Sequence, residues 1–368
     1  MYDVPHLRFP EFGGEWRKYK LAEICSFFSG GTPSSSKKEY YDGNIPFIRS
    51  GELHMDKTEL FITEVGLDNS AAKIVDVGDL LLALYGATSG DIAISQIKGA
   101  INQAILCIRT TQNKKFIESV WKKHVEKLLQ TYLQGGQGNL SADIVKNISF
   151  YFAESNEQIK LAKFITLLDE RIATQNKIIE DLKKLKSAIA ETVFNNMKGH
   201  LTNLSAICNI VKGKQVNGEE LSEKGKYYVM NGGITPSGYY DQCNTPANTI
   251  SVSEGGNSCG YVQYNKSSFW SGGHCYTLQD ITSGVDTQYL FHYLKRYESN
   301  IMNLRIGTGL PNIQKKDLEN FRIALPPSNV QKEISTCLTA IEDKIMVEVK
   351  WLDSAQKKKL YLLRQMFI

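Results

Sequence analysis

The sequence lacks long hydrophobic runs. Its longest apolar stretch, residues 80–85, is far shorter than the roughly 20 residues that a helix needs to span a bilayer. Residues 1–10 contain no apolar core of the kind found in secretory signals. We therefore expect a cytoplasmic protein that makes no use of a membrane.

Paired metal ligands and paired cysteines are also lacking. None of the 7 Cys has the Cys-x-x-Cys spacing of a zinc site, and the 6 His are dispersed. The odd number of Cys argues against a disulfide framework, so we expect free thiols and no metal site. The net charge of +4 is small, and by itself it neither indicates nor excludes a nucleic-acid partner.

Catalytic motifs are lacking as well. Residues 30–36 are rich in glycine but lack the lysine of a GxxxxGK[ST] phosphate loop, and no Asn/Asp-Pro-Pro-aromatic run occurs. The carboxylates Glu342 and Asp343 fall on a predicted helix, and His274 beside Cys275 is typical of packing or base contact. We expect no catalytic centre and no cofactor bound by this chain.

What the sequence does contain is an internal repeat. Asn139-Leu140 and Asn147-Ile148 recur as Asn312-Ile313 and Asn320-Phe321, at a constant offset of 173 in the numbering. The match continues without a gap over roughly 50 positions, which is the signature of a duplicated structural unit. Each copy of the repeat ends in a segment without proline, rich in Lys, Glu, Gln and Leu.

These end segments predict two long helices, at 156–199 and 329–368. Apolar residues follow heptad spacing, and a helix of about 40 residues is about 60 Å long and needs a partner for its seam. The obvious partner is the other copy, in an antiparallel coiled coil with pseudo-twofold symmetry. The seam comprises Leu161, Ile165, Leu168, Ile172, Ile179, Leu182, Ile189, Val193, Ile334, Leu338, Ile341, Ile345, Leu352, Leu362 and Met366.

Two polar residues interrupt each seam at equivalent positions. Gln175 corresponds to Glu348, and Lys186 corresponds to Lys359. One antiparallel register places Lys186 opposite Glu348 and Gln175 opposite Lys359, and we predict that register. The alternative is that these side chains only extend to solvent at the edge of the seam.

Residues 1–155 and 200–328 predict two mixed α/β domains, so that the fold class is α+β. Short apolar runs at 80–84, 101–108, 250–252 and 260–264 indicate strands, and 115–134 and 288–303 indicate amphipathic helices. The beginnings and ends of the two domains correspond, whereas the offset drifts between them. Matching ends with differing interiors are expected when one scaffold occurs twice and each copy recognises a different target.

Six blocks of the sequence stand out, at residues 30–34 (GGTPS), 39–53 (EYYDGNIPFIRSGEL), 78–81 (GDLL), 85–90 (YGATSG), 156–159 (NEQI) and 329–332 (NVQK). These blocks resemble the specificity subunits of Type I restriction-modification systems. The resemblance covers essentially the whole chain, in the order module, helix, module, helix. In most members a pair of prolines precedes each helix. Pro326-Pro327 fits that pattern, whereas Phe152-Ala153 departs from it.

The resemblance implies a division of labour. Each module would be a target-recognition domain that reads one half of a bipartite double-stranded DNA target, and the coiled coil would set the spacer. Two adenine methyltransferase subunits would dock on the helices and bring S-adenosylmethionine. Motor-nuclease subunits would bring ATP and Mg²⁺. The chain itself would not be an enzyme but the specificity component of a methyltransferase and deoxyribonuclease complex.

Base reading requires polar side chains on loops, because Arg or Lys pairs with guanine and Asn or Gln with adenine. For each candidate, the alternative is that it is an ordinary polar loop residue and makes no contact with DNA. In the first module the candidates are Arg49, Ser50, Tyr85, Thr88, Ser89, Asn102 and Gln103. In the second module they are Asn231, Ser253, Asn257, Ser258, Lys266 and His274. Candidates for phosphate contacts, in loops that could equally be tight turns before the helices, are Gln137, Asn139, Thr308 and Asn312.

Two other classes of protein remain open. Long heptad helices alone would permit an adaptor that binds other proteins and not DNA, and such a protein would show no sequence-dependent DNA binding. An enzyme with fused catalysis would transfer methyl groups from S-adenosylmethionine as the purified chain.

Overall fold

The structure is a computed structural model, and it describes residues 4–133, 139–307, 309 and 311–368. The chain divides into two compact units, residues 1–175 with 351–368, and residues 176–350. Each unit holds one sheet-rich module together with part of two long helices, α5 (Ser155–Asn195) and α9 (Ser328–Met366).

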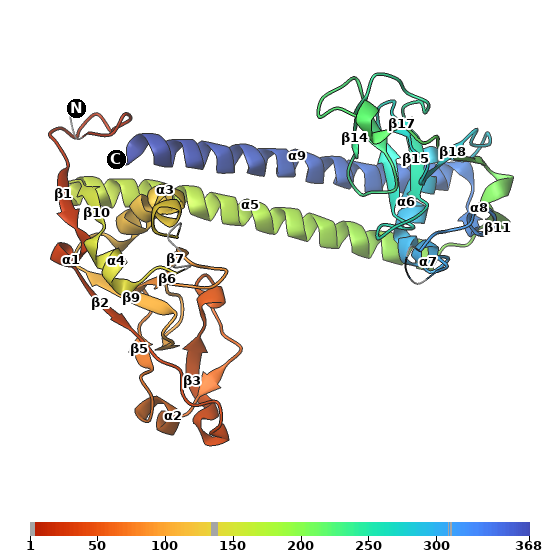
Figure 1. Cartoon of the computed structure of the whole chain (residues 1–368). Helices are drawn as coiled ribbons and strands as arrows, with labels where there is room; N and C mark the ends of the chain where they lie inside the picture. Colours follow the sequence, from red (N-terminus) through yellow and green to blue (C-terminus); the bar gives the residue numbers. More distant parts are fainter. Residues whose placement is uncertain (1–3, 134–138, 308, 310) are drawn as a thin grey trace. The chain divides into compact units, whose positions relative to one another are not determined.

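The module of the first unit is built on two four-stranded sheets (Figure 1). The central sheet has the order β2-β9-β6-β7, and the second, called the smaller sheet because fewer of its residues pair, has the order β4-β3-β8-β5. Its elements are β1 (Arg17–Lys20), α1 (Leu21–Ile24), β2 (Cys25–Ser29), β3 (Tyr41–Ile48), β4 (Phe61–Ile62), α2 (Glu64–Asp68), β5 (Lys73–Val75), β6 (Leu80–Ala83), β7 (Ile92–Ile94), β8 (Gly99–Ile101), β9 (Ile105–Thr110), α3 (Lys114–Leu133), α4 (Ala142–Asn147) and β10 (Ser149–Phe152).

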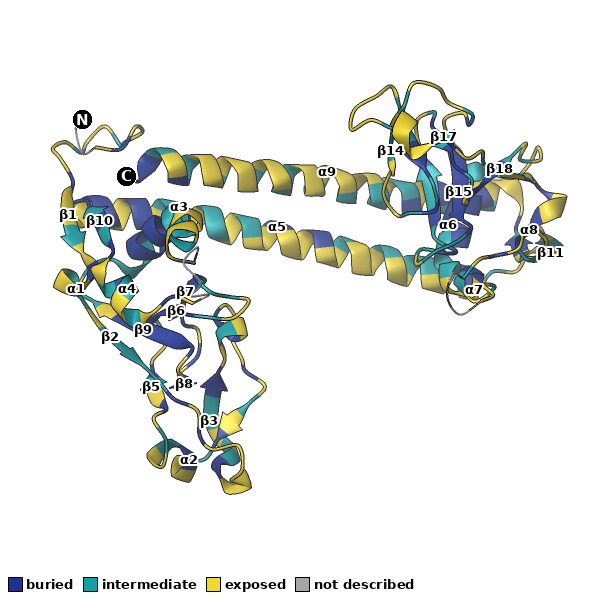
Figure 2. Ribbon diagram, viewed as in Figure 1, coloured by how far each residue is buried: buried dark blue, intermediate teal, exposed yellow. Residues whose placement is uncertain are grey.

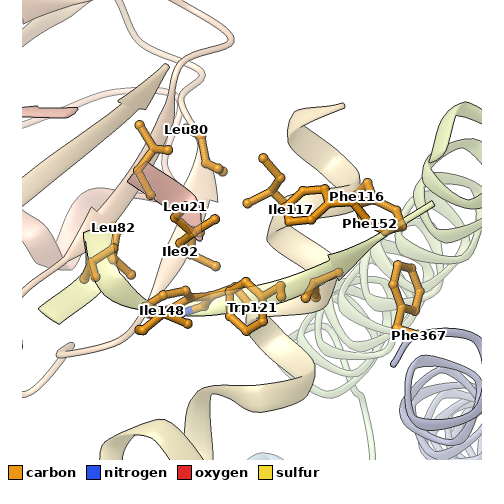
Figure 3. Packing of buried hydrophobic residues seen from close by; sticks show 14 of the residues in the cluster. Leu21, Leu80, Leu82, Ile92, Phe116, Ile117, Trp121, Ile148, Phe152 and Phe367 are labelled. Carbon is orange, nitrogen blue, oxygen red and sulfur yellow. The ribbon is translucent and has the colours of Figure 1, made fainter. Parts of the chain in front are cut away.

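Side chains alternate between the two faces of the central sheet, β2-β9-β6-β7, as the period of two in a strand requires. Leu80 and Leu82 of β6 point to a core that they share with Phe116 and Trp121 of α3 (Figure 3). Leu81 between them points to a second core, shared with the smaller sheet. The sheet therefore has a helix side and a small-sheet side, and both are buried, which explains why residues 80–84 read as a continuous apolar run.

The module of the second unit repeats this plan with a four-stranded sheet of order β12-β18-β15-β16 and a smaller sheet of order β14-β13-β17. Its elements are β11 (His200–Asn203), β12 (Asn209–Lys212), β13 (Tyr227–Met230), β14 (Gly238–Tyr240), β15 (Thr249–Ser253), β16 (Val262–Asn265), β17 (Trp270–Ser271), β18 (Cys275–Gln279), α6 (Thr287–Arg296), α7 (Glu298–Met302), α8 (Lys315–Glu319) and β19 (Arg322–Leu325).

The registers of the two central sheets match strand for strand. Leu80 pairs with Ile108 in the first module, and Ile250 pairs with Leu278 in the second. Ile250 packs on Tyr289 and Leu290 of α6, which covers the helix side of this sheet. Figure 2 shows β15 buried along its length.

A glutamine ties each module to the start of its long helix. The side chain of Gln158 accepts a hydrogen bond from the backbone N–H of Asn113 (3.2 Å) and donates one to the carbonyl of Ala153 (2.8 Å). Gln331, its counterpart at the offset of 173, accepts from Asp286 (2.9 Å) and donates to Pro326 (2.9 Å). Both glutamines are buried. The repeat in the sequence is therefore a repeat of individual hydrogen bonds.

An aromatic residue near the end of each long helix packs on a module. Phe367, just after α9, lies with its ring centroid 5.4 Å from that of Phe116 on α3 (Figure 3). Phe194, its counterpart in the repeat and near the end of α5, lies 5.8 Å from Tyr289 on α6. Both phenylalanines are at most 3% exposed. Each module therefore buries the aromatic side chain at the end of the helix that the other module begins.

The predicted seam is less exposed than the rest of α5 and α9. All of its residues are buried or intermediate in exposure, whereas neighbours such as Leu185 and Val347 are at least 50% exposed. Within the first unit, Asp169 pairs with Lys359, and the guanidinium of Arg171 lies 4.9 Å from the ring centroid of Trp351. Residue numbers rise along α5 as they fall along α9, so the helices are antiparallel there.

The predicted register of the seam is wrong by about one heptad. In the second unit Lys186 Nζ lies 3.0 Å from Glu342, six residues before the predicted partner Glu348. In the first unit the partner of Lys359 is Asp169, six residues before Gln175. A shift of one heptad leaves apolar positions facing apolar positions, so the apolar pattern could not decide between the two registers. The acidic partners in the two pairs, Asp169 and Glu342, correspond to each other at the offset of 173.

Two element boundaries also differ from the prediction. Residues 101–108 are not one strand, because Asn102 Oδ1 accepts the backbone N–H of Ala104 and turns the chain between β8 and β9. Residues 288–303 form two helices, α6 and α7, which meet at Tyr297. These turns lie inside runs of good periodicity, so the apolar pattern does not reveal them.

Candidate nucleic-acid interface

Two loops of the same shape follow β6 and β15. In each, two glycines four residues apart have positive φ, Gly86 (86°) and Gly90 (85°) in the first module, and Gly256 (77°) and Gly260 (90°) in the second. A Cβ on Gly90 would lie 2.8 Å from a side-chain carbon of Val125, and one on Gly260 would lie 2.8 Å from Met302 Cα. Only glycine fits there, so both modules hold this loop against a helix in the same way.

In the second module the loop forms one wall of a pocket. The pocket has a volume of about 560 Å³ and lies where β12, β13 and β15 end and where β18 begins. Five predicted DNA-contact residues line it, from segments far apart in the sequence: Asn231, Asn257, Ser258, His274 and Asn312. Lys212 and Glu254, which the sequence analysis did not single out, line it as well.

Two predicted residues of the second module do not reach this pocket surface. The hydroxyl of Ser253, which is 5% exposed, donates to the carbonyl of Gly232 (2.6 Å) and so serves the packing of the module. Lys266 lies on another side, with Nζ 2.8 Å from Asp343 of α9. Thr308 lies outside the described residues.

Glu254 is the most buried charged group of the pocket. Its Oε1 lies 2.6 Å from Lys212 Nζ and accepts a hydrogen bond from the hydroxyl of Tyr276 (3.0 Å). Burial raises the pKa of Tyr276, and the hydrogen bond to Glu254 raises it further, so this hydroxyl stays a donor at neutral pH. Asn231 Oδ1 accepts the backbone N–H of His274 (3.0 Å) and fixes the chain beside it.

In the first module the corresponding place is occupied by Arg49, directly after β3. Arg49 Nη2 lies 2.8 Å from Glu52 and 3.1 Å from Glu59, and Arg49 is about half exposed, at 48%. Burial alone would raise the pKa of Glu52, but hydrogen bonds from Arg49 and from Thr58 outweigh it and lower the pKa to about 2. Glu52 is thus ionised at neutral pH and holds the guanidinium toward a pocket of about 830 Å³.

The remaining candidates of the first module are not gathered in one pocket among the pockets described. Ser50 begins the short 3₁₀ turn 50–52 that carries Glu52. Gln103 accepts a hydrogen bond from the hydroxyl of Thr32 (2.7 Å) and also hydrogen-bonds Tyr85. The other positions are the loop residues Thr88 and Ser89, the turn residue Asn102 and the exposed Asn139, whereas Gln137 lies outside the described residues.

Sequence reasoning missed Lys212 and Glu254 because Lys212 is the last residue of a strand and Glu254 directly follows one, outside the polar loops. The signal that could have found them is the glycine spacing of the two loops. Matching Gly86 and Gly90 to Gly256 and Gly260 places Glu254 at the position of Leu84. A buried leucine in one module and a glutamate in the other mark a difference at the pocket.

The comparisons with known proteins agree with this architecture. The family model of the Type I restriction modification DNA specificity domain matches twice, at residues 13–184 and 201–352. The chain belongs to this family. The two matches together cover most of the sequence, and each includes one module.

Three relatives place the chain within the family. A putative type I specificity subunit of Mycoplasma genitalium is 30% identical over 182 residues, which are 47% of each chain. The MjaVIII specificity subunit of a Type I restriction enzyme from Methanocaldococcus jannaschii is 22% identical, over 97% of this chain and 93% of that one. The crystal structure of a Type I restriction-modification S subunit from M. genitalium covers 99% of both chains with a TM-score of 0.75 and 18% identity, and shows the same fold.

Two further features are absent from the described residues, a metal site and a membrane-spanning helix. Within them, no three or more His, Cys, Asp or Glu side chains are grouped so that they could hold a metal ion. Among the helices that the structure describes, none has the length and apolar character to cross a membrane.

Proposed function

We propose that this chain is the specificity subunit of a Type I restriction-modification complex, in which residues 1–155 and 200–328 are target-recognition domains. Each would read one half of a bipartite target in double-stranded DNA. The observation that supports this most strongly is the pair of modules that share one frame but differ at the pocket. Arg49 stands where the second module has Asn231, and these side chains favour different bases, guanine and adenine.

The long helices at 156–199 and 329–368 take the role of spacer and docking surface in this proposal. Two adenine methyltransferase subunits would bind them and supply S-adenosylmethionine, and motor-nuclease subunits would supply ATP hydrolysis with Mg²⁺. The chain would contribute no catalytic group and would act in the cytoplasm. Its repeat gives a physical reason for two identical partners, because the contacts of Gln158 and Gln331 present the same frame twice.

Mapping methylated adenines in the DNA of cells with and without this chain tests the proposal. We expect a motif of two short blocks, separated by a gap of fixed length, that disappears when the chain is absent. A contiguous motif, or methylation that does not depend on the chain, would contradict the proposal.

The spacer role has its own test. Removing one heptad from α5 and the equivalent heptad from α9 keeps the seam in phase. The gap between the two blocks should then change while the blocks stay the same. An unchanged gap would show that the helices do not set it.

A further inference from the structure

Glu254 stands at a position where the backbone is fixed on both sides. Its N–H donates to the carbonyl of His274 (2.9 Å), and its carbonyl accepts from Ile313 (2.8 Å). In the first module Leu84 makes the same two bonds, with Ala104 and Leu140, each 2.8 Å long. The two modules therefore hold one backbone position in the same way and differ in the side chain that it carries.

The two carboxylate oxygens of Glu254 have unequal surroundings. Oε1 is bound by Lys212 and by the hydroxyl of Tyr276. Oε2 is covered from solvent and has no hydrogen-bond partner among the described residues. The ring of His274 stands beside it, with Nδ1 3.8 Å away, which is beyond hydrogen-bond distance. Leaving a buried charged acceptor unsatisfied is costly, so a donor that reaches Oε2 would gain a strong hydrogen bond.

His274 is the exposed neighbour of this oxygen. Its side chain is 64% exposed, whereas that of Glu254 is 10% exposed. Both residues line the pocket, together with Asn231, Asn257 and Asn312. For a base to reach Oε2, the exposed ring would have to turn away from it, while Lys212 and Tyr276 hold the carboxylate through Oε1.

We infer that Glu254 reads one base of the second half-site, by accepting a hydrogen bond from the amino group of a cytosine through Oε2. This inference rests on the proposed function. A carboxylate can only accept hydrogen bonds, and on the major-groove edge cytosine presents a single donor, N4. The first module, with Leu84 at this position, has no equivalent reader there.

The test uses the full chain assembled with its methyltransferase subunits and DNA duplexes in which each base pair of the mapped target is changed in turn. Glu254→Gln replaces the carboxylate by an amide of the same shape, and an amide pairs best with adenine. We expect one position of the second half-site to lose its cytosine preference by about 10-fold or more and to gain affinity for adenine. The first half-site should read as in the wild type, which reports that the rest of the chain is intact.

Three further variants keep the result interpretable. Glu254→Leu installs the residue of the first module and should remove the preference at this position without creating one for adenine. His274→Ala removes another side chain of the same pocket and so distinguishes the imidazole from the carboxylate as the reader. Glu219→Gln makes the same chemical change at an exposed glutamate outside the pocket and is the control that should leave every base preference unchanged. Amide hydrogen exchange in β15 and β18 reports whether the second module remains folded in each variant.

The outcomes separate the inference from the proposed function. If the wild-type complex discriminates bases but Glu254→Gln reads the second half-site as before, the inference is wrong and the proposed function stands. Loss of the preference in His274→Ala, with none in Glu254→Gln, would make the imidazole the reader and also overturn it. A wild-type complex without any base preference would overturn the proposed function, and the inference with it.

Discussion

The two modules agree on the helix side of their central sheets. Leu80 and Leu82 in the first module, and Ile250 and Val252 in the second, are all fully buried against α3 or α6. The hydrogen bonds of Gln158 and Gln331 then attach each helix to its neighbouring segments in the same way. In both units the helix side of the sheet packs against a helix, α3 or α6, so its residues have to be apolar in both modules.

On the small-sheet side the two modules differ. The first module has the apolar residues Leu81 and Ala83, and the second has Ser251 and Ser253 at the paired positions. Ser251 hydrogen-bonds Asn265 (2.9 Å), and Glu254 brings a charge to the edge of the same strand. The difference teaches that the frame is determined by packing on helices, whereas the opposite side can change its chemistry without changing the fold.

The largest effect should come from removing the aromatic residue at the end of either long helix. Phe367→Ala and Phe194→Ala each delete a buried ring, and we expect a loss of about 3–5 kcal/mol in the free energy of unfolding. Amide exchange should increase around α3 in the first variant and around α6 in the second. If either variant increased amide exchange equally in both modules, each phenylalanine would not stabilise only its own module, and the prediction would be wrong.

The next largest effect is a difference between the two units in how their stability depends on pH. Burial lowers the pKa of His292 to about 3, and the charge of Lys186 lowers it in the same direction. His292 Nε2 lies 2.9 Å from Thr339 Oγ1, and Nδ1 lies 4.0 Å from Glu342. The first unit has Ser119 at the equivalent position.

The folded-state pKa of His292 lies below its ordinary value of 6.5, so its contribution to stability is complete above about pH 6.5. That contribution is lost as the pH falls toward 3, by about 3 kcal/mol at pH 4. Burial also lowers the pKa of His124 in the first unit, where a hydrogen bond to the carbonyl of Ile368 opposes it. Denaturant unfolding of wild type and His292→Ser from pH 7 to pH 4 measures the difference, and equal pH slopes would refute the prediction.

The smallest effect concerns the ion pairs between α5 and α9. Lys186→Met and Lys359→Met each remove one partly exposed pair and should each change stability by at most about 1 kcal/mol. Burial would raise the pKa of Asp169, but hydrogen bonds from Lys115 and Lys359 lower it. The ionised Asp169 therefore stabilises the fold at pH values above the ordinary pKa of an aspartate. This stabilisation is lost as the pH falls through the lowered pKa. Its pKa, followed by NMR, should rise in Lys359→Met, and no change would disprove the pairing.

The helices and their seam could be predicted because period and repeat coincide. Residues such as Leu161 and Ile334 stand at heptad positions and are also related by the offset of 173, so two independent patterns agree. The register could not be predicted, because the pattern is unchanged by a shift of seven. The ion pairs that mark it involve Asp169 and Glu342, which lie beside the seam and look like ordinary surface charges in the sequence.

The pocket could be predicted only in part. Polar loop residues such as Asn257 and His274 stand out in the sequence, and the fold brings them together. Lys212 ends β12, which the apolar pattern did not predict, and Glu254 directly follows β15, so their role appears only when β12, β15 and β18 pair. Lys266 shows the opposite case, a charge on a loop that turns toward α9.

Arg49 and Asn231 offer the most direct test of the claim that one chain holds two independent readers. Each follows the corresponding strand of the smaller sheet, β3 or β13. The measurement is the base preference at every position of both half-sites, for the complex with wild-type chain, Arg49→Ala and Asn231→Ala. Each variant should lose about 1–3 kcal/mol of discrimination in one half-site, a different one in each case, and leave the other unchanged. A variant that alters both half-sites, or two variants that alter the same one, would contradict the account.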